Sequence, residues 1–239
     1  QQDFVSAVSH ELKTPLTSIR MYGEILKQGW ASEEKKRSYY DFIYDESERL
    51  SRLINNVLQL ARMNRNEQMP ELSVCSVPEL LKEVEVKITS QVKAADFKLT
   101  IDSNESINDV SISIDRDWLM QVMINLVDNA VKFSAKAELK EVAVGARLVG
   151  KDSVQFSISD FGPGIDQQHM KAIFELFYRS ANELTRDTVG TGIGLSLVHQ
   201  MVTTMAGKVT VKNRQDVKTS QTSSGAVFSV SFPTVIASK

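Results

Sequence analysis

The stretch SHELKTPLT, residues 9–17, lies within a helical pattern and decides how the amino-terminal part of the chain folds. Around it, apolar residues and one glycine recur at steps of three and four, which is the spacing of a buried helical stripe. The members of this stripe are Val5, Val8, Leu12, Leu16, Ile19, Gly23 and Leu26. At about 100° of rotation per residue, His10 lies about 160° from the centre of the stripe. The sequence therefore predicts a histidine that faces solvent.

The residues that follow His10 add further chemistry to the exposed side of this helix. Glu11 offers a carboxylate beside the histidine, and Thr14 offers a hydroxyl one turn later. Pro15 removes a backbone donor from the helix interior, so we expect a kink near the histidine. Taken alone, the stretch also fits an ordinary solvated surface histidine, and only the remaining sequence distinguishes the two interpretations.

The composition favours a folded chain and argues against several classes of function. Of the 239 residues, 42% are hydrophobic, which is enough for one large domain or two small ones. The formal net charge of −2 provides no basic field, so we expect no nucleic-acid partner. Cys75 is the single cysteine, and no paired thiols or clustered histidines indicate a metal site. A reducing, cytosolic setting fits these features.

The sequence contains no segment typical of a membrane protein. No apolar run approaches the roughly 18 to 20 residues that a membrane span needs. The first residues, QQDFVSAVSHEL, lack the basic start and apolar core of a signal peptide. We therefore expect no membrane contact by this fragment. Because the chain begins inside a helical pattern, we also expect it to be part of a longer protein.

Two long helices are predicted over residues 1–28 and 33–65, joined by a short loop around Gly29. Ser32 followed by Glu33 and Glu34 is typical of a helix start, with the hydroxyl as the cap. The second helix repeats the apolar spacing of the first, with Ile43, Leu50, Leu53, Ile54, Val57, Leu60 and Ala61. One apolar seam per helix cannot close a core, so we expect a second copy of the chain to complete a four-helix bundle.

The polar residues 67–71, which include Pro70, predict a linker, and strands and helices alternate after it. Strands are predicted at 72–75, 97–101, 112–114, 142–148 and 154–159. Helices are predicted at 77–93 and at 118–133, the second capped by Asp115. We further expect a short helix around Met170, a helix ending at Met205, and two closing strands separated by a Ser/Thr-rich loop at 219–224. The pattern predicts an α+β fold.

The stretch NLVDNAVKFS, residues 125–134, is the first of three patches that indicate a binding site. On a helix, Asn125, Asn129 and Lys132 lie on one face, because they are spaced by four and three residues. Two carboxamide oxygens and an ammonium suit Mg²⁺ that carries phosphate oxygens, since this ion keeps waters and takes few protein ligands. A solvated polar helix face is the alternative for this patch alone.

The other two patches are glycine-rich. In DFGPGI, residues 160–165, Asp160 ends a strand and is placed to accept a hydrogen bond from an exocyclic amine, although a plain turn also fits. In GTGIGL, residues 190–195, backbone amides at a helix start can cradle phosphate. This turn lacks the third glycine of the dinucleotide fingerprint and the GK[ST] of a Walker-type loop.

Together and in this order, these motifs resemble the boxes of a sensor histidine kinase. SHELKTPLT is similar to the H box, the asparagine helix to the N box, DFGPGI to G1, FELFYR at residues 174–179 to the F box, and GTGIGL to G2. The resemblance covers essentially the whole chain. It implies an α+β protein with an N-terminal helical hairpin that forms a dimeric four-helix bundle, followed by an α/β sandwich of the Bergerat ATP-binding type. The implied domains are a dimerisation and phosphotransfer hairpin at 1–66, a linker at 67–71 and a catalytic ATP-binding domain at 72–239.

The resemblance also implies roles for individual residues. His10 matches the phosphoacceptor, Glu11 the general base, Thr14 the hydroxyl that positions water for dephosphorylation, and Arg179 an arginine near the γ-phosphate. Asn129 and Asn125 match the Mg²⁺ contacts. The positions that match the ATP site are Asn125, Asn129, Lys132, Phe133, Asp160, Gly162, Gly164, Ile165, Gly190, Thr191, Gly192, Ile193, Gly194 and Leu195. Phe133 stands where family members often have tyrosine, so one polar contact should be missing.

The implied activity is transfer of phosphate from ATP, with Mg²⁺, to His10 and then to an aspartate of a response regulator, with dephosphorylation of that regulator as a further activity. The fragment is then the cytoplasmic portion of an inner-membrane sensor, anchored upstream. His169 and His199 lie outside the motifs and are interpreted as structural or solvated. The alternatives are a member biased toward phosphatase activity, a dimeric scaffold or pseudokinase, and a mechanical ATPase, which has no use for SHELKTPLT.

Overall fold

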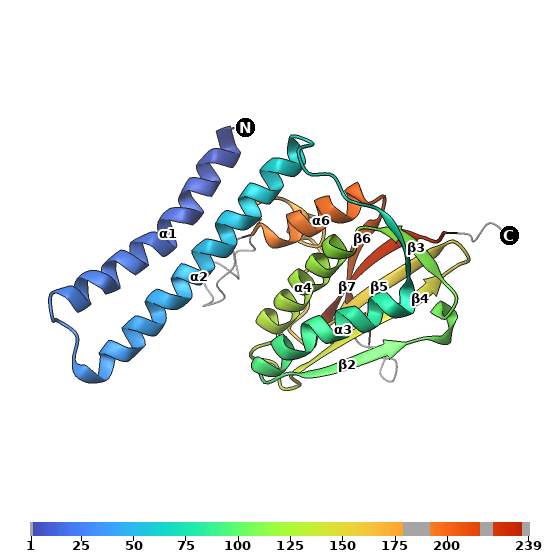
Figure 1. Cartoon of the computed structure of the whole chain (residues 1–239). Coiled ribbons are helices and arrows are strands. Elements are labelled where there is room, and N and C mark those ends of the chain that lie inside the picture. Colours follow the sequence, from blue (N-terminus) through green and yellow to red (C-terminus); the bar gives the residue numbers. More distant parts are fainter. Residues whose placement is uncertain (1, 179–191, 216–221, 236–239) are drawn as a thin grey trace. The chain divides into compact units, whose positions relative to one another are not determined.

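The computed structural model describes residues 2–178, 192–215 and 222–235 (Figure 1). The chain divides into two compact units, Gln1–Gln68 and Met69–Lys239. Part of the predicted linker is fixed to the second unit, because the backbone N–H of Glu71 donates to Asp115 Oδ2 at 2.8 Å. Each unit has its own arrangement of secondary structure and is described separately.

The first unit is a helical hairpin of α1 (Gln2–Lys27) and α2 (Glu33–Asn64). Gly29, in the loop between the two helices, has a φ of +70°, a backbone conformation that glycine adopts more readily than other residues. The Tyr22 ring packs against Tyr39 and Phe42, with centroids 5.0 and 4.6 Å apart. Both helices begin and end within two residues of the predicted bounds, and Pro15 lies inside α1. The predicted Ser32 cap is only partly right, since the residue occupies the cap position but its side chain makes no cap hydrogen bond.

The second unit contains a five-stranded sheet in the order β2-β4-β5-β7-β6, covered on one face by α3, α4 and α6 (Figure 1). β2 pairs with β4 in parallel, and the remaining pairs are antiparallel. The strands are β2 (Lys98–Ser103), β4 (Glu141–Val149), β5 (Ser153–Ser159), β6 (Lys208–Gln215) and β7 (Thr222–Pro233). The helices are α3 (Val77–Ala94), α4 (Arg116–Phe133) and α6 (Gly194–Thr204), with 3₁₀ turns η1 (Glu105–Ile107) and η2 (Ala172–Phe174). The α+β prediction is confirmed.

The core of the second unit follows from the two periodicities of its sequence. Along β5, Val154, Phe156 and Ile158 are buried and alternate with polar residues, so one face of the strand meets the helices. Along α4, Leu119, Met123 and Leu126 recur at steps of four and three and are fully buried. These two stripes face each other, because α4 packs against β5. The layer arrangement thus places the carboxyl end of α4 beside the end of β5.

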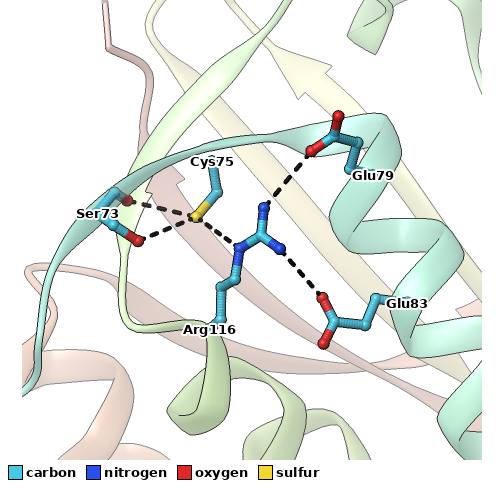
Figure 2. Close-up of polar contacts among 5 residues, drawn as sticks. All are labelled: Ser73, Cys75, Glu79, Glu83 and Arg116. Carbon is cyan, nitrogen blue, oxygen red and sulfur yellow. Dashed lines mark hydrogen bonds and ion pairs between the residues drawn. The ribbon is translucent and has the colours of Figure 1, made fainter.

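The amino end of α4 is fixed by two consecutive residues. Asp115 caps the helix, as predicted, by accepting from the Trp118 N–H at 3.0 Å. The next residue, Arg116, reaches back to two other elements (Figure 2). Its Nε donates to the buried Cys75 Sγ at 3.3 Å in β1 (Ser73–Ser76), which pairs with β3 (Ser111–Ile114). Its terminal nitrogens lie 3.5 Å from Glu79 and 3.7 Å from Glu83, both on α3.

Two predicted elements differ from the structure. Around Met170 the chain forms hydrogen-bonded turns followed by η2, because the segment is too short for the apolar repeat that stabilises an isolated helix. The predicted loop at 219–224 extends too far, since β7 begins at Thr222, which pairs with Gln215. Threonine and serine are compatible with a strand, so their polarity alone did not mark its start.

Candidate functional site

Asp160 follows the last residue of β5 and is buried, with only 4% of its surface exposed. Its Oδ1 accepts from the backbone N–H groups of Gly162 at 2.9 Å and Ala226 at 3.1 Å. Its own N–H donates to the Ala226 carbonyl at 2.9 Å, so the main chain and side chain are both held by β7. Both backbone donors use the same carboxylate oxygen, Oδ1.

Burial raises the pKa of the Asp160 carboxyl, because water no longer solvates its charge. The N–H groups of Gly162 and Ala226, the Ser134 hydroxyl and the Arg214 charge act in the opposite direction. Ser134 is itself fully buried, and its Oγ has no well-aligned hydrogen-bond partner within the described residues. A buried carboxylate beside an unsatisfied hydroxyl is costly for structure alone and fits a site that binds polar groups of a ligand.

The carboxyl end of α4 and the loop at 160–165 meet at Gly162. A Cβ at this position would lie 3.0 Å from the Phe133 carbonyl and 3.0 Å from Ser134 Oγ, so only glycine allows this approach. On α4 itself, Asn125, Asn129 and Lys132 are all half-buried and share one helix face, as predicted. Lys132 Nζ lies 4.7 Å from the centroid of the Phe133 ring. The structure therefore brings the asparagine helix and the Asp/Gly loop together.

The aromatic segment packs on the start of the second glycine motif. Phe177 N–H donates to the Gly192 carbonyl at 2.9 Å, and a Cβ on Gly192, whose φ is +66°, would lie 2.8 Å from Phe177 Cα. Two residues later, Gly194 begins α6, with Leu195 in its first turn and Ile193 buried before it. The other predicted residues of this region, Arg179, Gly190 and Thr191, lie outside the described residues.

The helical hairpin presents the predicted histidine face. The His10 side chain is 80% exposed, as predicted from its position on the side of the helix opposite the apolar stripe. Glu11 Oε1 lies 3.9 Å from His10 Nδ1, close enough for electrostatic attraction but too far for a hydrogen bond. The Thr14 hydroxyl, one turn away, donates to the His10 carbonyl at 3.3 Å. An exposed imidazole, a largely buried carboxylate and an exposed hydroxyl therefore lie within about one turn of α1.

The two other histidines make contacts outside these motifs. The His169 Nδ1 is hydrogen-bonded to the Tyr178 hydroxyl, and its Nε2 lies 3.2 Å from Gln168 Nε2. His199, exposed on α6, has its ring centroid 6.0 Å from that of Phe174. Both environments agree with the structural or solvated roles expected for these residues.

Three residues around the loop at 160–165 were missed by sequence reasoning. Ser134 ends α4, Asn213 hydrogen-bonds to Ile165, and the Arg214 guanidinium lies 3.6 Å from the Phe161 ring centroid. Ser134 could have been noticed as the polar residue that ends an apolar helix. Asn213 and Arg214 carry no sequence signal, because their proximity to the loop depends on how β6 pairs with β7.

The described residues include neither a metal-binding cluster nor a membrane-spanning helix. No group of three or more histidine, cysteine or acidic side chains in this part of the chain is arranged to hold a metal ion. Across the same residues, every helix is too short or too polar to span a bilayer.

Comparisons with known proteins agree with this geometry. Residues 1–66 match the family described as "His Kinase A (phospho-acceptor) domain", and residues 114–236 match "Histidine kinase-, DNA gyrase B-, and HSP90-like ATPase". The sensor protein SrrB of Staphylococcus aureus (strain NCTC 8325 / PS 47) is 30% identical over 234 residues, which is 98% of this chain and 38% of SrrB. The chain thus spans well under half the length of this curated relative.

Solved structures share the fold at lower identity. The Acinetobacter baumannii histidine kinase AdeS has a TM-score of 0.70 and 19% identity, and the match covers 94% of this chain and 97% of AdeS. Full-length ShkA in complex with AMPPNP has a TM-score of 0.66 and 24% identity, and the match covers 99% of this chain and 47% of ShkA. Histidine kinase ThkA in complex with the response regulator protein TrrA has a TM-score of 0.72 and 23% identity, and the match covers 97% of this chain and 61% of that chain. At these identities the likeness shows the fold alone.

Proposed function

Because the chain belongs to the sensor histidine kinase family, we propose that it transfers the γ-phosphoryl group of ATP to His10 and from there to an aspartate of a response regulator. The observation that carries this proposal is the combination of two features in one chain. A buried Asp160 with a raised pKa lies beside the carboxyl end of α4, the helix that carries the two asparagines, and a His10 imidazole that is 80% exposed lies on a separate hairpin. The first suits a bound nucleotide, and the second suits a group that must reach two different partners.

In the nucleotide site, Asp160 accepts a hydrogen bond from the exocyclic amine of adenine through the carboxylate oxygen that its backbone donors leave free. Buried Ser134 provides a second polar group at the same place. Gly162 and Gly164 let backbone approach the base. The start of α6 at Gly194 directs backbone N–H groups toward phosphate. Lys132 contributes a positive charge from the α4 face.

Mg²⁺ fits this site by the chemistry of its donors. Asn125 and Asn129 offer two hard carboxamide oxygens from successive turns of α4, and a magnesium ion that keeps several waters needs few protein ligands. The ion, when bound, neutralises negative charge on the β and γ phosphates.

The transfer step uses the neutral imidazole of His10. Its Nε2 attacks the γ-phosphorus in line, a nitrogen–phosphorus bond forms, and the bond to the bridging oxygen breaks so that ADP leaves. Glu11 Oε1 lies 3.9 Å from His10 Nδ1, so the carboxylate favours the tautomer with the proton on Nδ1. As positive charge develops on the ring, the carboxylate attracts the Nδ1 proton. The phosphoryl group then passes to an aspartate carboxylate of the receiver, and His10 returns to its neutral form.

The hairpin supports a homodimer. Val5, Leu16 and Ile54 belong to the predicted apolar stripes and are exposed in the single chain, which a second hairpin would cover in a four-helix bundle. The receiver is the remaining protein partner, and no nucleic-acid partner is proposed. The fragment is the cytoplasmic portion of a sensor anchored in the inner membrane by a segment upstream.

Two variants and two measurements test the kinase assignment. His10→Gln should retain binding of AMPPNP with Mg²⁺ and lose incorporation of label from γ-labelled ATP, because only the acceptor has changed. Asn129→Asp should lose both nucleotide binding and label incorporation, since a negatively charged carboxylate replaces a neutral carboxamide beside the negatively charged phosphates. Equal labelling of wild type and His10→Gln would contradict the proposal, and so would a wild-type chain that binds no nucleotide.

A phosphatase activity toward the phosphorylated receiver is the second candidate function. It is favoured by the position of Thr14, whose hydroxyl lies on the exposed segment one turn from His10. A hydroxyl at this distance can orient a water for attack on an acyl phosphate held near the histidine.

A further inference from the structure

Asn213 on β6 makes a two-point contact with the nucleotide loop. Its Oδ1 accepts from the Ile165 N–H at 2.8 Å, and its Nδ2 donates to the Ile165 carbonyl at 2.8 Å. The two residues are 48 positions apart in the sequence. A carboxamide is suited to this task, because it offers one acceptor and two donors on a short, planar group. The side chain thus pairs with the loop as a neighbouring strand would.

The contact fixes the turn that precedes Ile165. Gly164 has a φ of +76°, and a Cβ there would lie 3.0 Å from Asn213 Oδ1 and 3.4 Å from the Gly225 carbonyl. The carboxamide therefore occupies the space that a side chain at Gly164 would need. The loop contains two glycines and one exposed proline, and the Asn213 carboxamide adds side-chain hydrogen bonds that help to define its backbone conformation.

The same rung of the β6–β7 ladder holds the other end of the loop. Asn213 pairs with Ala226, and Ala226 donates to Asp160 Oδ1 and accepts from the Asp160 N–H. Ile165 and Asp160 are therefore attached to neighbouring residues of one strand pair. The distance between the turn at Gly164 and the carboxylate follows from this attachment.

An irregularity in β6 adds a contact in the middle of the loop. The register shifts between Asn213 and Gln215, and bulges of this kind redirect side chains. Arg214 lies at the shift, and its guanidinium carbon is 3.6 Å from the centroid of the Phe161 ring. This charge also lowers the pKa of Asp160, against the larger effect of burial. Two consecutive residues of β6 thus act on the loop: Asn213 binds Ile165, and Arg214 packs on Phe161 and interacts electrostatically with Asp160.

We propose that Asn213 is a positioning residue for nucleotide binding, which holds the turn at Gly164 and Ile165 in register with the Asp160 carboxylate. This inference rests on the proposed function, since the positioned loop is the adenine side of the ATP site. Among the described residues, the Asn213 side chain is hydrogen-bonded to the backbone of the loop. Its effect on the ligand therefore passes through the geometry of residues 160–165.

The test compares wild type with Asn213→Asp and with Lys212→Ala, an exposed position on the same strand. The dissociation constant of AMPPNP with Mg²⁺ is measured by calorimetry at a temperature where all three chains are folded. At about pH 8, Asn213→Asp should bind about tenfold more weakly, equivalent to about 1.4 kcal/mol, because the ionised carboxylate cannot donate to the Ile165 carbonyl. Lys212→Ala should bind as wild type does.

Two further readouts separate positioning from general stabilisation. The ratio of dissociation constants between Asn213→Asp and wild type should decrease as the pH is lowered from about 8 toward the ordinary aspartate pKa of about 3.9, because a growing fraction of the carboxyl is protonated and regains a donor. In the nucleotide-free chain, the Ile165 amide should exchange faster in Asn213→Ala, which removes its acceptor, whereas amides in the middle of β5 should not. If Asn213→Asp does not fold, Asn213→Ser provides the same comparison with one hydrogen bond removed.

The outcomes distinguish the two proposals. Nucleotide binding by wild type, with equal affinity in the folded Asn213 variants, would overturn the positioning role and leave the proposed function intact. A change in affinity matched by equal changes in exchange throughout the sheet would also overturn it. A wild-type chain that does not bind AMPPNP would overturn the proposed function and this inference together.

Discussion

At the scale of one residue, Asp160 is a buried carboxyl whose ionised form lowers the stability of the fold. A carboxyl whose pKa is raised by burial destabilises the fold when it is ionised, and the backbone hydrogen bonds from Gly162 and Ala226 offset only part of this effect. The folded chain holds this proton more tightly than the unfolded chain. The contribution of Asp160 to stability therefore falls as pH rises from its ordinary pKa of 3.8 through the higher folded value, and stays low above it.

Asp160→Asn should separate folding from binding. The amide oxygen can still accept from Gly162 and Ala226, and no charge is buried, so the nucleotide-free variant should unfold at a temperature no lower than wild type at about pH 7.5. Affinity for AMPPNP should fall at least about tenfold, because a charged acceptor for the adenine amine is lost. Thermal unfolding and calorimetry measure the two effects. A variant that unfolds earlier yet binds normally would show that the carboxylate is structural.

Thr14→Ala tests the second candidate function at the residue scale. The Thr14 hydroxyl donates to the His10 carbonyl within α1, and alanine favours the helix, so the hairpin should stay folded. Labelling of His10 should remain within about twofold of wild type, while dephosphorylation of a phosphorylated receiver should slow about tenfold or more. Timed release of phosphate from the receiver provides the measurement. Lost labelling with unchanged phosphatase activity would count against the assigned role.

At the scale of elements, the start of α6 depends on two glycines with different constraints. Gly192 has a positive φ and lies against the backbone of Phe177, whereas a Cβ on Gly194 would meet no atom of the described residues within 4 Å. Gly192→Ala should therefore lower the free energy of unfolding by about 1 to 3 kcal/mol. Gly194→Ala should change it by less than about 0.5 kcal/mol.

Nucleotide binding distinguishes these two variants further. A methyl group on Gly194 enters the space where phosphate would approach the helix amino terminus, so Gly194→Ala should weaken AMPPNP binding while leaving the nucleotide-free chain stable. Urea unfolding and calorimetry on both variants provide the comparison. Unchanged affinity in Gly194→Ala would place the phosphates elsewhere.

The sequence predicted most elements because their periodicities are strong. α1, α2, α3, α4 and α6 each follow an apolar stripe, and β4 and β5 alternate, so their bounds fell within a few residues. Prediction was wrong for the helix near Met170 and for the start of β7 at Thr222. In both places the conformation depends on tertiary contacts, such as the hydrogen bond between Tyr178 and His169, which no local pattern encodes.

At the scale of the whole molecule, the motifs indicated the candidate site but not the contacts that support it. Asp160, Asn129 and Gly192 were identified from short patterns, because their chemistry is local. Ser134 and Asn213 were not, since they meet the loop only after α4 has packed on the sheet and β6 has paired with β7. Residues far apart in sequence are brought together by topology, which spacing alone does not reveal.

The dimer is a prediction at the same scale. Ile54 is 41% exposed in the single chain although it belongs to the apolar stripe of α2. Ile54→Glu should place a charge in the seam of a four-helix bundle, so the chain should become monomeric and keep its helical circular dichroism. Val86→Glu, at an exposed apolar position on α3, is the matched control and should leave the dimer intact. Sedimentation equilibrium that finds wild type monomeric would contradict the bundle.

The central claim is that His10 accepts the γ-phosphoryl group of ATP. Its most direct test is to label the chain with γ-labelled ATP and Mg²⁺, and to treat the product with acid and with alkali. His10→Gln is compared with His199→Gln, which removes another exposed histidine. We expect label that is lost in acid, kept in alkali, absent from His10→Gln and unchanged in His199→Gln. Label that survives acid, or that persists in His10→Gln, would contradict it.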